Sequence, residues 1–259
     1  MKVDSIIFDL DGTLWDTCHS CAVGWNNVIK RHHIQFREVT AEDIRSVAGE
    51  PHEECIRQIF NEMSEADIQL LIEEISIEDN RIVSDLGGEL YPGVKTGLQK
   101  LNQRFPLFIV SNCQSGYIET FLKWSGLSSQ FQDFECWGNT GLSKSENLKN
   151  IIKRNDLRCS IFAGDTQGDA DAAKNNNIPF AFAQYGFGRA QDFDIFFHSF
   201  DELCDKILLN FSDESEALLN SAIETKLKMS YEDRIESHEA ARQLATDLMS
   251  AGEKLRAES

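Results

Sequence analysis

Residues 5–14 decide the fold, and they read SIIFDLDGTL. The stretch begins with an apolar run that does not alternate in polarity, which is typical of a strand buried on both faces of a parallel sheet. Asp9 and Asp11 follow at positions i and i+2, so their side chains point the same way at the carboxyl end of the strand. Open α/β sheets bind their ligands at that end. Gly12 then permits a tight turn that a residue with a Cβ atom would disfavour.

Three further apolar runs have the same character, and helical patterns separate them. The runs cover residues 107–110, 159–163 and 179–183, and the helical patterns cover residues 93–101, 116–124, 146–153 and 169–175. This alternation predicts a doubly wound, mainly parallel, Rossmann-like α/β sheet.

One segment interrupts the alternation. Residues 16–85 show helical periodicity without a convincing strand, which predicts a helical cap inserted into a core made of residues 1–15 and 86–211. Residues 212–259 are rich in Ala, Glu, Leu and Lys and predict a C-terminal helical extension. That extension is either a solvated, frayed terminal helix or a helix that binds a partner or a second copy. We therefore expect a monomer or a homodimer.

The composition restricts the function classes. A chain of 259 residues with 41% hydrophobic residues can bury one large core or two modest ones. Its formal net charge of −18, without a basic cluster, argues against a nucleic-acid partner. Every apolar run is shorter than the ~18 residues that a membrane span needs. Seven scattered cysteines and the lack of a secretory pattern predict reduced thiols and a cytoplasmic protein.

Further polar side chains lie after the other predicted strands. The second strand ends in Ser111 and Asn112, Lys144 directly precedes a helical pattern, and the third strand leads into Asp165 and Asp169. Lys144 could present an ammonium group to a phosphate. The two later acids could join the first pair at one metal, although Asp169 could instead cap the helix that follows.

The first acidic pair requires a cation or a shared proton, because neighbouring carboxylates repel each other. Mg²⁺ is the expected cation, since it is hard, prefers oxygen ligands and suits phosphate substrates. A phosphorylated metabolite is itself an anion, so a bound cation and a local lysine must reverse the field of this acidic chain at the site.

These four motifs, in this order and on successive strand ends, resemble the haloacid dehalogenase-like hydrolase superfamily over residues 1–210. The resemblance implies that Asp9 is the nucleophile and Asp11 the general acid and base. It assigns phosphate binding to Ser111, Asn112 and Lys144, and metal binding to Asp9, Asp165, Asp169 and the backbone carbonyl of Asp11. The helical cap between the first two motifs is similar to that of the phosphoglycolate phosphatase-like branch.

One position departs from that branch. Many of its members have proline after the lysine, whereas Ser145 follows Lys144 here, and Lys149 and Lys153 lie nearby on the same predicted helix. Lys144 is the preferred phosphate ligand because the residue just before a helix faces the strand ends, whereas the later lysines are expected in solvent.

Two loops are candidates for the rim of the site. Residues 45–52 form a glycine-containing turn between helical patterns, and in similar capped phosphatases this turn reaches over the active site. Arg45, Gly49 and His52 are therefore expected substrate contacts, although Arg45 or His52 could equally form a surface salt bridge. Residues 185–189, YGFGR, either shape the pocket or form a plain tight loop.

The expected activity is hydrolysis of a small-molecule phosphate monoester through an aspartyl-phosphate on Asp9. Asp11 would protonate the leaving alkoxide and then activate a water. A phosphomutase similar to β-phosphoglucomutase would carry the same motifs and is the alternative. A haloacid dehalogenase is disfavoured by Asp11, and a non-catalytic binding module is disfavoured by the presence of every motif acid.

Overall fold

The computed structural model describes residues 3–209 of the chain. Within them, six strands form one sheet in the order β5-β4-β1-β6-β7-β8, and every neighbouring pair is parallel. The bounds are β1 Ser5–Phe8, β4 Leu107–Ser111, β5 Phe131–Cys136, β6 Ser160–Gly164, β7 Phe180–Ala183 and β8 Ile195–Phe197. The prediction of a doubly wound α/β fold is therefore confirmed. The predicted helical extension over residues 212–259 lies outside the described residues.

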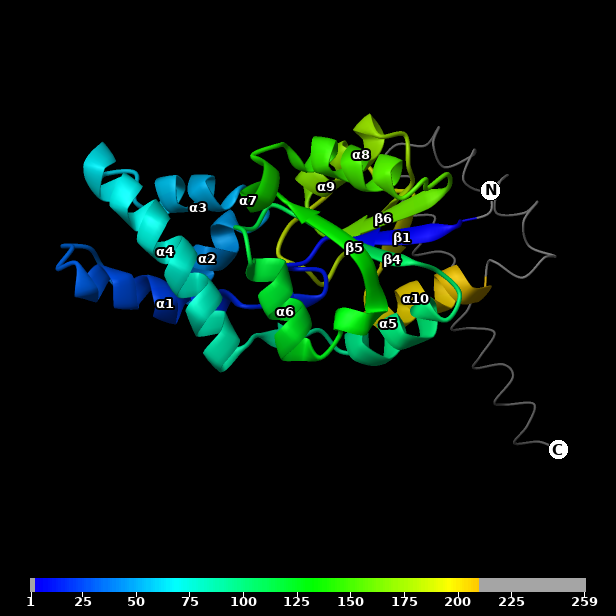
Figure 1. The fold of residues 1–259 in the computed structure, drawn as a ribbon, viewed down its shortest axis with the longest axis horizontal. Helices are drawn as coiled ribbons and strands as arrows, with labels where there is room; N and C mark the ends of the chain where they lie inside the picture. Colours follow the sequence, from blue (N-terminus) through cyan, green and yellow to red (C-terminus); the bar gives the residue numbers. More distant parts are fainter. Residues whose placement is uncertain (1–2, 210–259) are drawn as a thin grey trace, which may run out of the picture.

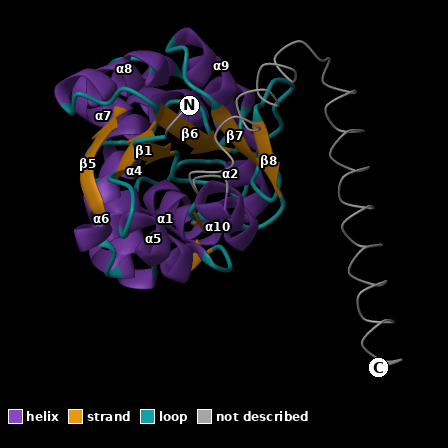
Figure 2. Cartoon of the chain, turned by 90° about the vertical axis from the view of Figure 1, so that its right-hand side faces the viewer, coloured by secondary structure: helices purple, strands orange, loops and turns teal. Residues whose placement is uncertain are grey.

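Helices cover both faces of this sheet (Figure 2). One face carries α8 (Lys144–Arg154) and α9 (Gln167–Asn175), and the other carries α5 (Val94–Asn102), α6 (Tyr117–Ser125) and α10 (Phe200–Leu209). The short helix α7 (Trp137–Thr140) and the 3-10 helix η1 (Ser128–Gln130) flank β5. In the described part of the chain, no helix combines the length and the apolarity that a bilayer crossing needs.

The central strands supply side chains to both layers, because successive strand residues face opposite sides. Ile7, Phe108 and Phe162 join one buried cluster with Leu148 and Ile151 of α8. The adjacent positions on the same strands face the other side of the sheet and join a second buried cluster with residues of α5, α6 and α10. These strand positions are Ile6, Phe8, Leu107, Ile109, Ile161 and Ala163. Apolar burial on both faces holds the strand ends, and the polar side chains that follow them, in fixed positions.

Two strands of the sheet, β5 and β8, were not predicted from the sequence. β5 reads FQDFEC and lies at one edge, so polar residues interrupt its apolar pattern. Two of them, Asp133 and Glu135, pair with Arg154 of α8 at 2.6 and 2.5 Å. β8 forms the opposite edge and has only three residues. Edge strands need less apolar surface than central ones, which explains why these two give a weak signal.

Four helices lie beyond one end of the sheet (Figure 1). They are α1 (Cys18–Arg31), α2 (Ala41–Val47), α3 (His52–Ile59) and α4 (Glu65–Leu86). They are inserted between β2 (Trp15–Asp16) and β3 (Glu89–Leu90), which pair antiparallel where the chain leaves the core and returns to it. We propose these four helices as the cap, and its limits at residues 16 and 85 remain a prediction.

Helix α4 packs along α1 and carries charge on its buried side. Its buried apolar residues recur at helical spacing and include Ile68, Leu71, Ile75, Ile82 and Val83. The same helix also buries the carboxylates of Glu78 and Asp79. Buried carboxylates are costly unless they are paired, so each needs a partner inside the cap.

Candidate active site

The candidate site lies at the carboxyl end of the three central strands. Asp9 follows β1, Ser111 ends β4, and Asp165 follows β6. β1 pairs with β4 on one side and with β6 on the other, so the chain winds outward in both directions from this point. Ligands of open α/β sheets bind at such a switch point.

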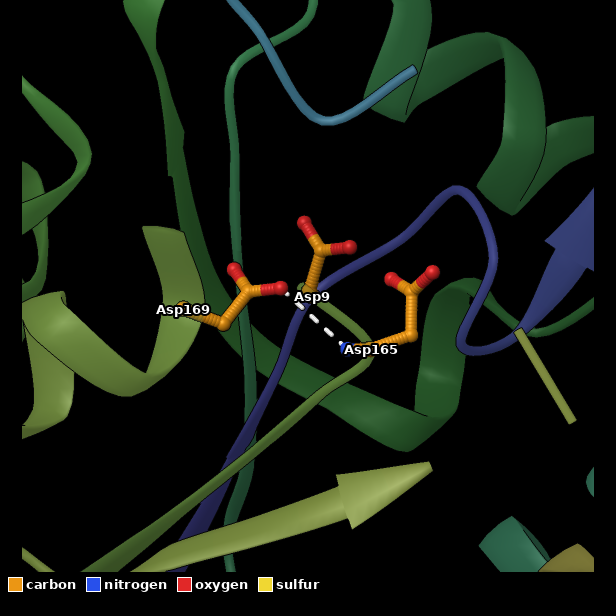
Figure 3. A group of neighbouring side chains, drawn as sticks. All are labelled: Asp9, Asp165 and Asp169. Atoms are coloured by element: carbon orange, nitrogen blue, oxygen red, sulfur yellow. Dashed lines mark hydrogen bonds between the residues drawn. The ribbon is translucent and has the colours of Figure 1, made fainter. Parts of the chain in front are cut away.

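Asp9, Asp165 and Asp169 form a buried acidic group (Figure 3). One carboxylate oxygen from each lies within 4.8 Å of the other two. Burial raises the pKa of Asp9 well above its ordinary range, and Lys144 opposes that rise. Burial, and then the charge of Asp169, raises the pKa of Asp165 to about 7. Three hard oxygen ligands that repel one another fit a small divalent cation such as Mg²⁺.

Lys144 is the cation that the chain itself brings to this group. Its Nζ lies 2.8 Å from Asp9 Oδ1 and 2.7 Å from Asp169 Oδ1. Burial would lower the pKa of this ammonium, but Asp169 and Asp9 outweigh that effect and raise the pKa above its usual value. Lys144 is the first residue of α8 and follows the capping residue Ser143, whereas Lys149 of the same helix is exposed.

Asp169 has two roles in the geometry. Its Oδ1 accepts from Lys144, and its Oδ2 accepts from Thr166 Oγ1 at 2.7 Å and from the Asp165 backbone N–H at 3.2 Å. Thr166 and Asp169 thereby form the capping box of α9. Helix capping and membership of the acidic group, which the sequence offered as alternatives, therefore occur together.

The carboxylate of Asp11 is held apart from this acidic group. Its Oδ1 lies 3.2 Å from Thr17 Oγ1 and 3.0 Å from Tyr117 Oη. These two hydroxyls are also 2.6 Å apart, so one of them donates to the other and the remaining hydroxyl hydrogen is donated to Oδ1. Desolvation raises the pKa of Asp11 to about 6, and the hydrogen bonds from Tyr117 and Thr17 limit the rise. The predicted metal contact of Asp11 through its backbone carbonyl remains a prediction.

The two residues that end β4 differ in their contacts. Ser111 Oγ accepts from the Cys113 backbone N–H at 3.2 Å, which leaves the hydroxyl hydrogen available to a ligand. Asn112 Nδ2 donates to the Gly49 carbonyl at 2.8 Å, and the Asn112 carbonyl accepts from the His52 backbone N–H at 3.2 Å. Asn112 thus joins the core to the cap turn, and its phosphate-binding role remains a prediction.

The cap residues named from the sequence lie in different surroundings. Arg45 forms a 2.8 Å salt bridge with Asp16, and its guanidinium carbon lies 5.5 Å from the centre of the Phe187 ring. Gly49 has φ +98°, and a Cβ atom there would lie 2.8 Å from Thr166 Cγ2. The glycine therefore lets the cap turn approach the core loop closely. His52 is buried and bonds to a cap carboxylate.

The loop over residues 185–189, a candidate for the rim of the site, makes contacts with the acidic group and the first loop that the sequence did not specify. The backbone N–H groups of Phe187 and Gly188 donate to Asp165 Oδ2 at 2.7 and 3.1 Å. Tyr185 Oη donates to the Thr13 carbonyl at 2.7 Å. The loop over residues 185–189 therefore shapes the site, which favours the first of the two interpretations offered for it. Its paired glycines were the available signal.

Some of these groups line one cavity of about 80 Å³, whereas Asp165 and Asp169 lie behind Asp9 and are not among its lining residues. One ordered water needs roughly 10–15 Å³ by the same measure, so several waters or a small ligand fit. Asp9, Ser111 and Lys144 line the core side, whereas Gly49 and His52 line the cap side. Arg45 is not among the lining residues.

A buried carboxylate group with one lysine lies at the switch point of a doubly wound parallel sheet and beneath an inserted helical layer, which is where α/β enzymes place their active sites. The family model for haloacid dehalogenase-like hydrolase matches residues 6–183. The chain belongs to this haloacid dehalogenase-like hydrolase family.

Relatives and solved structures agree with the assignment. The chain is 29% identical over 193 residues to the phosphoglycolate phosphatase of Agrobacterium fabrum, a match that covers 70% of this chain and 80% of the relative. It is 25% identical over 199 residues to the phosphoglycolate phosphatase of Vibrio parahaemolyticus, covering 72% and 86%. A haloacid dehalogenase-like family hydrolase from Streptococcus pneumoniae shares the fold, with a TM-score of 0.69, 20% identity and coverage of 81% and 99%.

Proposed function

We propose that this chain is a Mg²⁺-dependent phosphatase that hydrolyses a small-molecule phosphate monoester through an aspartyl-phosphate on Asp9. The observation that carries the proposal is the position of Asp9, a buried residue that lines the cavity, whose Oδ1 is bound by Lys144 and which lies beside two further acids. The names of the curated relatives, which are phosphoglycolate phosphatases, support a phosphatase.

The first chemical step is the attack of Asp9 on phosphorus. Lys144 fixes Oδ1 of this carboxylate, so Oδ2 is the oxygen presented to the substrate. Lys144 and the free hydroxyl hydrogen of Ser111 both lie at the same cavity wall, where they can bind the non-bridging phosphate oxygens. Positive charge and donors placed there stabilise the charge of the transition state.

Asp11 moves the protons. With Oδ1 accepting the hydrogen bond from Thr17 or Tyr117, the proton resides on Oδ2 and passes to the leaving oxygen as the phosphorus–oxygen bond breaks. The resulting carboxylate then accepts a proton from the water that attacks the aspartyl-phosphate. A pKa of about 6 lets Asp11 act in both directions near neutral pH.

The acidic group is the proposed Mg²⁺ site. Asp9 and Asp165 would supply carboxylate oxygens, with the Asp11 carbonyl as a backbone ligand, and Asp169 would hold Lys144 and the loop around them. A bound Mg²⁺ would neutralise phosphate oxygens and so reduce their repulsion of Asp9. We also propose a cytoplasmic location, which the seven free cysteines support.

Metal removal tests this proposal. We expect the purified chain to release phosphate from p-nitrophenyl phosphate, to lose that activity in EDTA and to regain it with Mg²⁺. Asp165→Asn should raise the Mg²⁺ concentration for half-maximal activity at least ~10-fold. Asp171→Asn, an exposed acid on α9, is the matched control and should leave that concentration unchanged. Full activity in a rigorously metal-free preparation would contradict the proposal.

A further inference from the structure

The carboxyl group of Asp11 lies at the end of a short chain of hydroxyl groups. Thr17 Oγ1 and Tyr117 Oη are 2.6 Å apart, and they lie 3.2 and 3.0 Å from Asp11 Oδ1. Both hydroxyl side chains are buried, and all three residues line the cavity. Two hydroxyls that are 100 positions apart in the chain therefore converge on one carboxyl oxygen.

A buried hydroxyl hydrogen needs an acceptor, and this requirement ties both side chains to Asp11. The two hydroxyl groups carry two hydrogens, of which one lies between their oxygens. Among the described residues, Asp11 Oδ1 is the acceptor within hydrogen-bond distance for the other hydrogen. Tyr117 therefore donates either to Oδ1 itself or to the Thr17 hydroxyl that donates to Oδ1. In both orders its phenol hydroxyl is part of the chain that ends at Asp11.

The phenol of Tyr117 is held in place from several sides. Tyr117 is the first residue of α6 and follows Gly116, whose φ of +85° turns the chain into the helix. Its ring packs edge-on against that of Trp15, with 5.6 Å between the ring centres. The Asn80 side chain on α4 donates to the Ser115 carbonyl at 2.8 Å, just before this turn. A hydroxyl held this firmly can fix the orientation of a carboxyl group that it contacts.

The contacts distinguish the two carboxyl oxygens of Asp11. Both hydroxyl contacts are to Oδ1, whereas no hydrogen bond within the described part of the chain reaches Oδ2. Asp11 retains partial exposure and lines the same cavity as Asp9, so Oδ2 is the oxygen available to a leaving group. A displacement of about 1 Å at a reacting group can cost ~10²-fold in rate, so the partners that fix Oδ1 also affect proton transfer at Oδ2.

We propose that Tyr117 is a positioning residue, whose phenol hydroxyl, together with that of Thr17, holds the Asp11 carboxyl group in the orientation that protonates the leaving alcohol. The inference rests on the proposed phosphatase function and adds to it a residue that acts through Asp11. The segment between β4 and α6 then serves the site at both ends, because it begins after Ser111, a proposed phosphate ligand, and leads into Tyr117.

Two esters of similar shape test this role in the full chain: p-nitrophenyl phosphate and p-methoxyphenyl phosphate. The p-nitrophenolate group leaves with little protonation, whereas the more basic p-methoxyphenolate group depends on the acid. The quantity to compare is kcat/KM, because it covers the steps up to release of the phenol and excludes the later hydrolysis of the aspartyl-phosphate. In Tyr117→Phe, we expect kcat/KM for the p-methoxyphenyl ester to fall ~10-fold or more beyond any fall for the p-nitrophenyl ester.

Tyr91→Phe is the matched control. Tyr91 is half-buried, packs against Tyr185 with 4.6 Å between the ring centres, and is not among the residues that line the cavity. This variant loses a phenol hydroxyl away from Asp11 and should keep the wild-type ratio of the two kcat/KM values. Adding Tyr117→Phe to an Asp11→Asn chain is the second test. Because Tyr117 acts through Asp11, the added substitution should change neither kcat/KM value by more than ~2-fold.

The remaining outcomes are also decisive. An equal loss for both esters, or no loss in folded Tyr117→Phe, would overturn the inference and leave the phosphatase proposal standing. A selective loss that persists in the Asp11→Asn chain would overturn it too, because Tyr117 would then act without Asp11. If Tyr117→Phe fails to fold, as judged by circular dichroism, Thr17→Val breaks the same hydroxyl chain. A selective loss for the p-methoxyphenyl ester in that variant would then support the inference, and an equal loss would overturn it. No phosphate release from either ester by the wild-type chain would overturn the proposed function, and this inference with it.

Discussion

Gly12 brings two loops of the site into contact. Its φ is +84°, and a Cβ atom at this position would collide with the Asp165 carboxylate. The sequence indicated that a turn follows Asp11, but the approach of Asp165 depends on a segment about 150 residues away, and no local pattern encodes that contact. The glycine therefore serves both the backbone turn and the spacing of the acidic group.

Gly12→Ala should consequently lower both stability and activity. Gly126 is a matched control, because its φ is +70° and a Cβ atom there would meet nothing within 4 Å. Gly126→Ala should lower the free energy of unfolding by about 1 kcal/mol through backbone strain alone. Gly12→Ala should lose more in urea unfolding and should reduce kcat/KM at least ~10-fold, because Asp165 must move. Equal destabilisation of the two variants with normal activity would show that the contact is unimportant.

Lys144 pairs with two buried carboxylates. Lys144→Met keeps much of the side-chain volume but leaves Asp9 and Asp169 without their cation. We expect the free energy of unfolding, measured in urea with EDTA present, to fall by about 3 kcal/mol, the lower end of the scale for breaking a buried ion pair. Lys149→Met, on the exposed side of α8, should change it by less than about 0.5 kcal/mol. A similar loss in both variants would contradict the buried role of Lys144.

At the level of single residues, the strand-end acids could be predicted and their partners could not. Asp9 and Asp165 each follow a strand with a clear apolar pattern, and Lys144 begins a helix with a clear helical pattern. Because the strands are parallel, the sequence predicted that these three side chains lie at the same edge of the sheet. Tyr117 binds Asp11 across 106 positions, and its sequence neighbours give no sign of this. Such pairs depend on how α6 packs beside the first loop, which is decided by tertiary contacts.

Among the elements, α4 shows why a buried charge can stabilise the cap. The Glu78 side chain is 2% exposed and lies 2.7 Å from Arg31 and 2.6 Å from Arg81. The hydrogen bond from Arg81, supported by those from Arg31 and Asn27, lowers the pKa of Glu78 from 4.5 to about 2. The ion pairs therefore stabilise the fold fully above pH 4.5 and are lost as the pH falls towards 2.

Glu78→Gln should reveal this pH dependence. At pH 6 we expect the variant to be less stable than the wild type by about 1 kcal/mol, because half-exposed arginines are screened by solvent. The difference should shrink between pH 4.5 and 2, as urea unfolding followed by circular dichroism can measure. Glu73→Gln, exposed on α4, should show no such trend. A difference that stays constant with pH would contradict the ionic origin of the effect.

The elements that are buried most completely were the ones that the sequence predicted best. The four central apolar runs were found because both faces of those strands are covered, and the helical patterns were found from their periodicity. β5 and β8 lie at the sheet edges, where polar and short sequences suffice. The segment over residues 16–85, predicted to be helical, contains four separate helices, and the last of them, α4, runs on to Leu86.

Across the whole molecule, the site exists where the cap turn meets the core. The side-chain amide of Asn112 donates a hydrogen bond to the Gly49 carbonyl. The backbone carbonyl of Asn112 accepts one from the backbone N–H of His52. Composition and pattern predicted a core with an inserted helical segment, but the polar atoms that the two parts share come from their packing. Asp79 is the clearest case, because a carboxylate in the middle of a long helix gives no sequence signal that it lines a cavity.

The central claim is that Asp9 becomes phosphorylated and that Asp11 serves both steps without being the nucleophile. With p-nitrophenyl phosphate, whose leaving group needs little protonation, Asp11→Asn should still be phosphorylated and should release that phosphate slowly. Asp9→Asn should form no phosphoenzyme and should lose several orders of magnitude in rate.

Intact-mass spectrometry of acid-quenched protein measures this directly. The account predicts the mass of one phosphoryl group on the Asp11→Asn chain, mapped by peptide analysis to Asp9, and none on the Asp9→Asn chain. A phosphoryl group on Asp9→Asn, or one mapped to any residue other than Asp9, would contradict it.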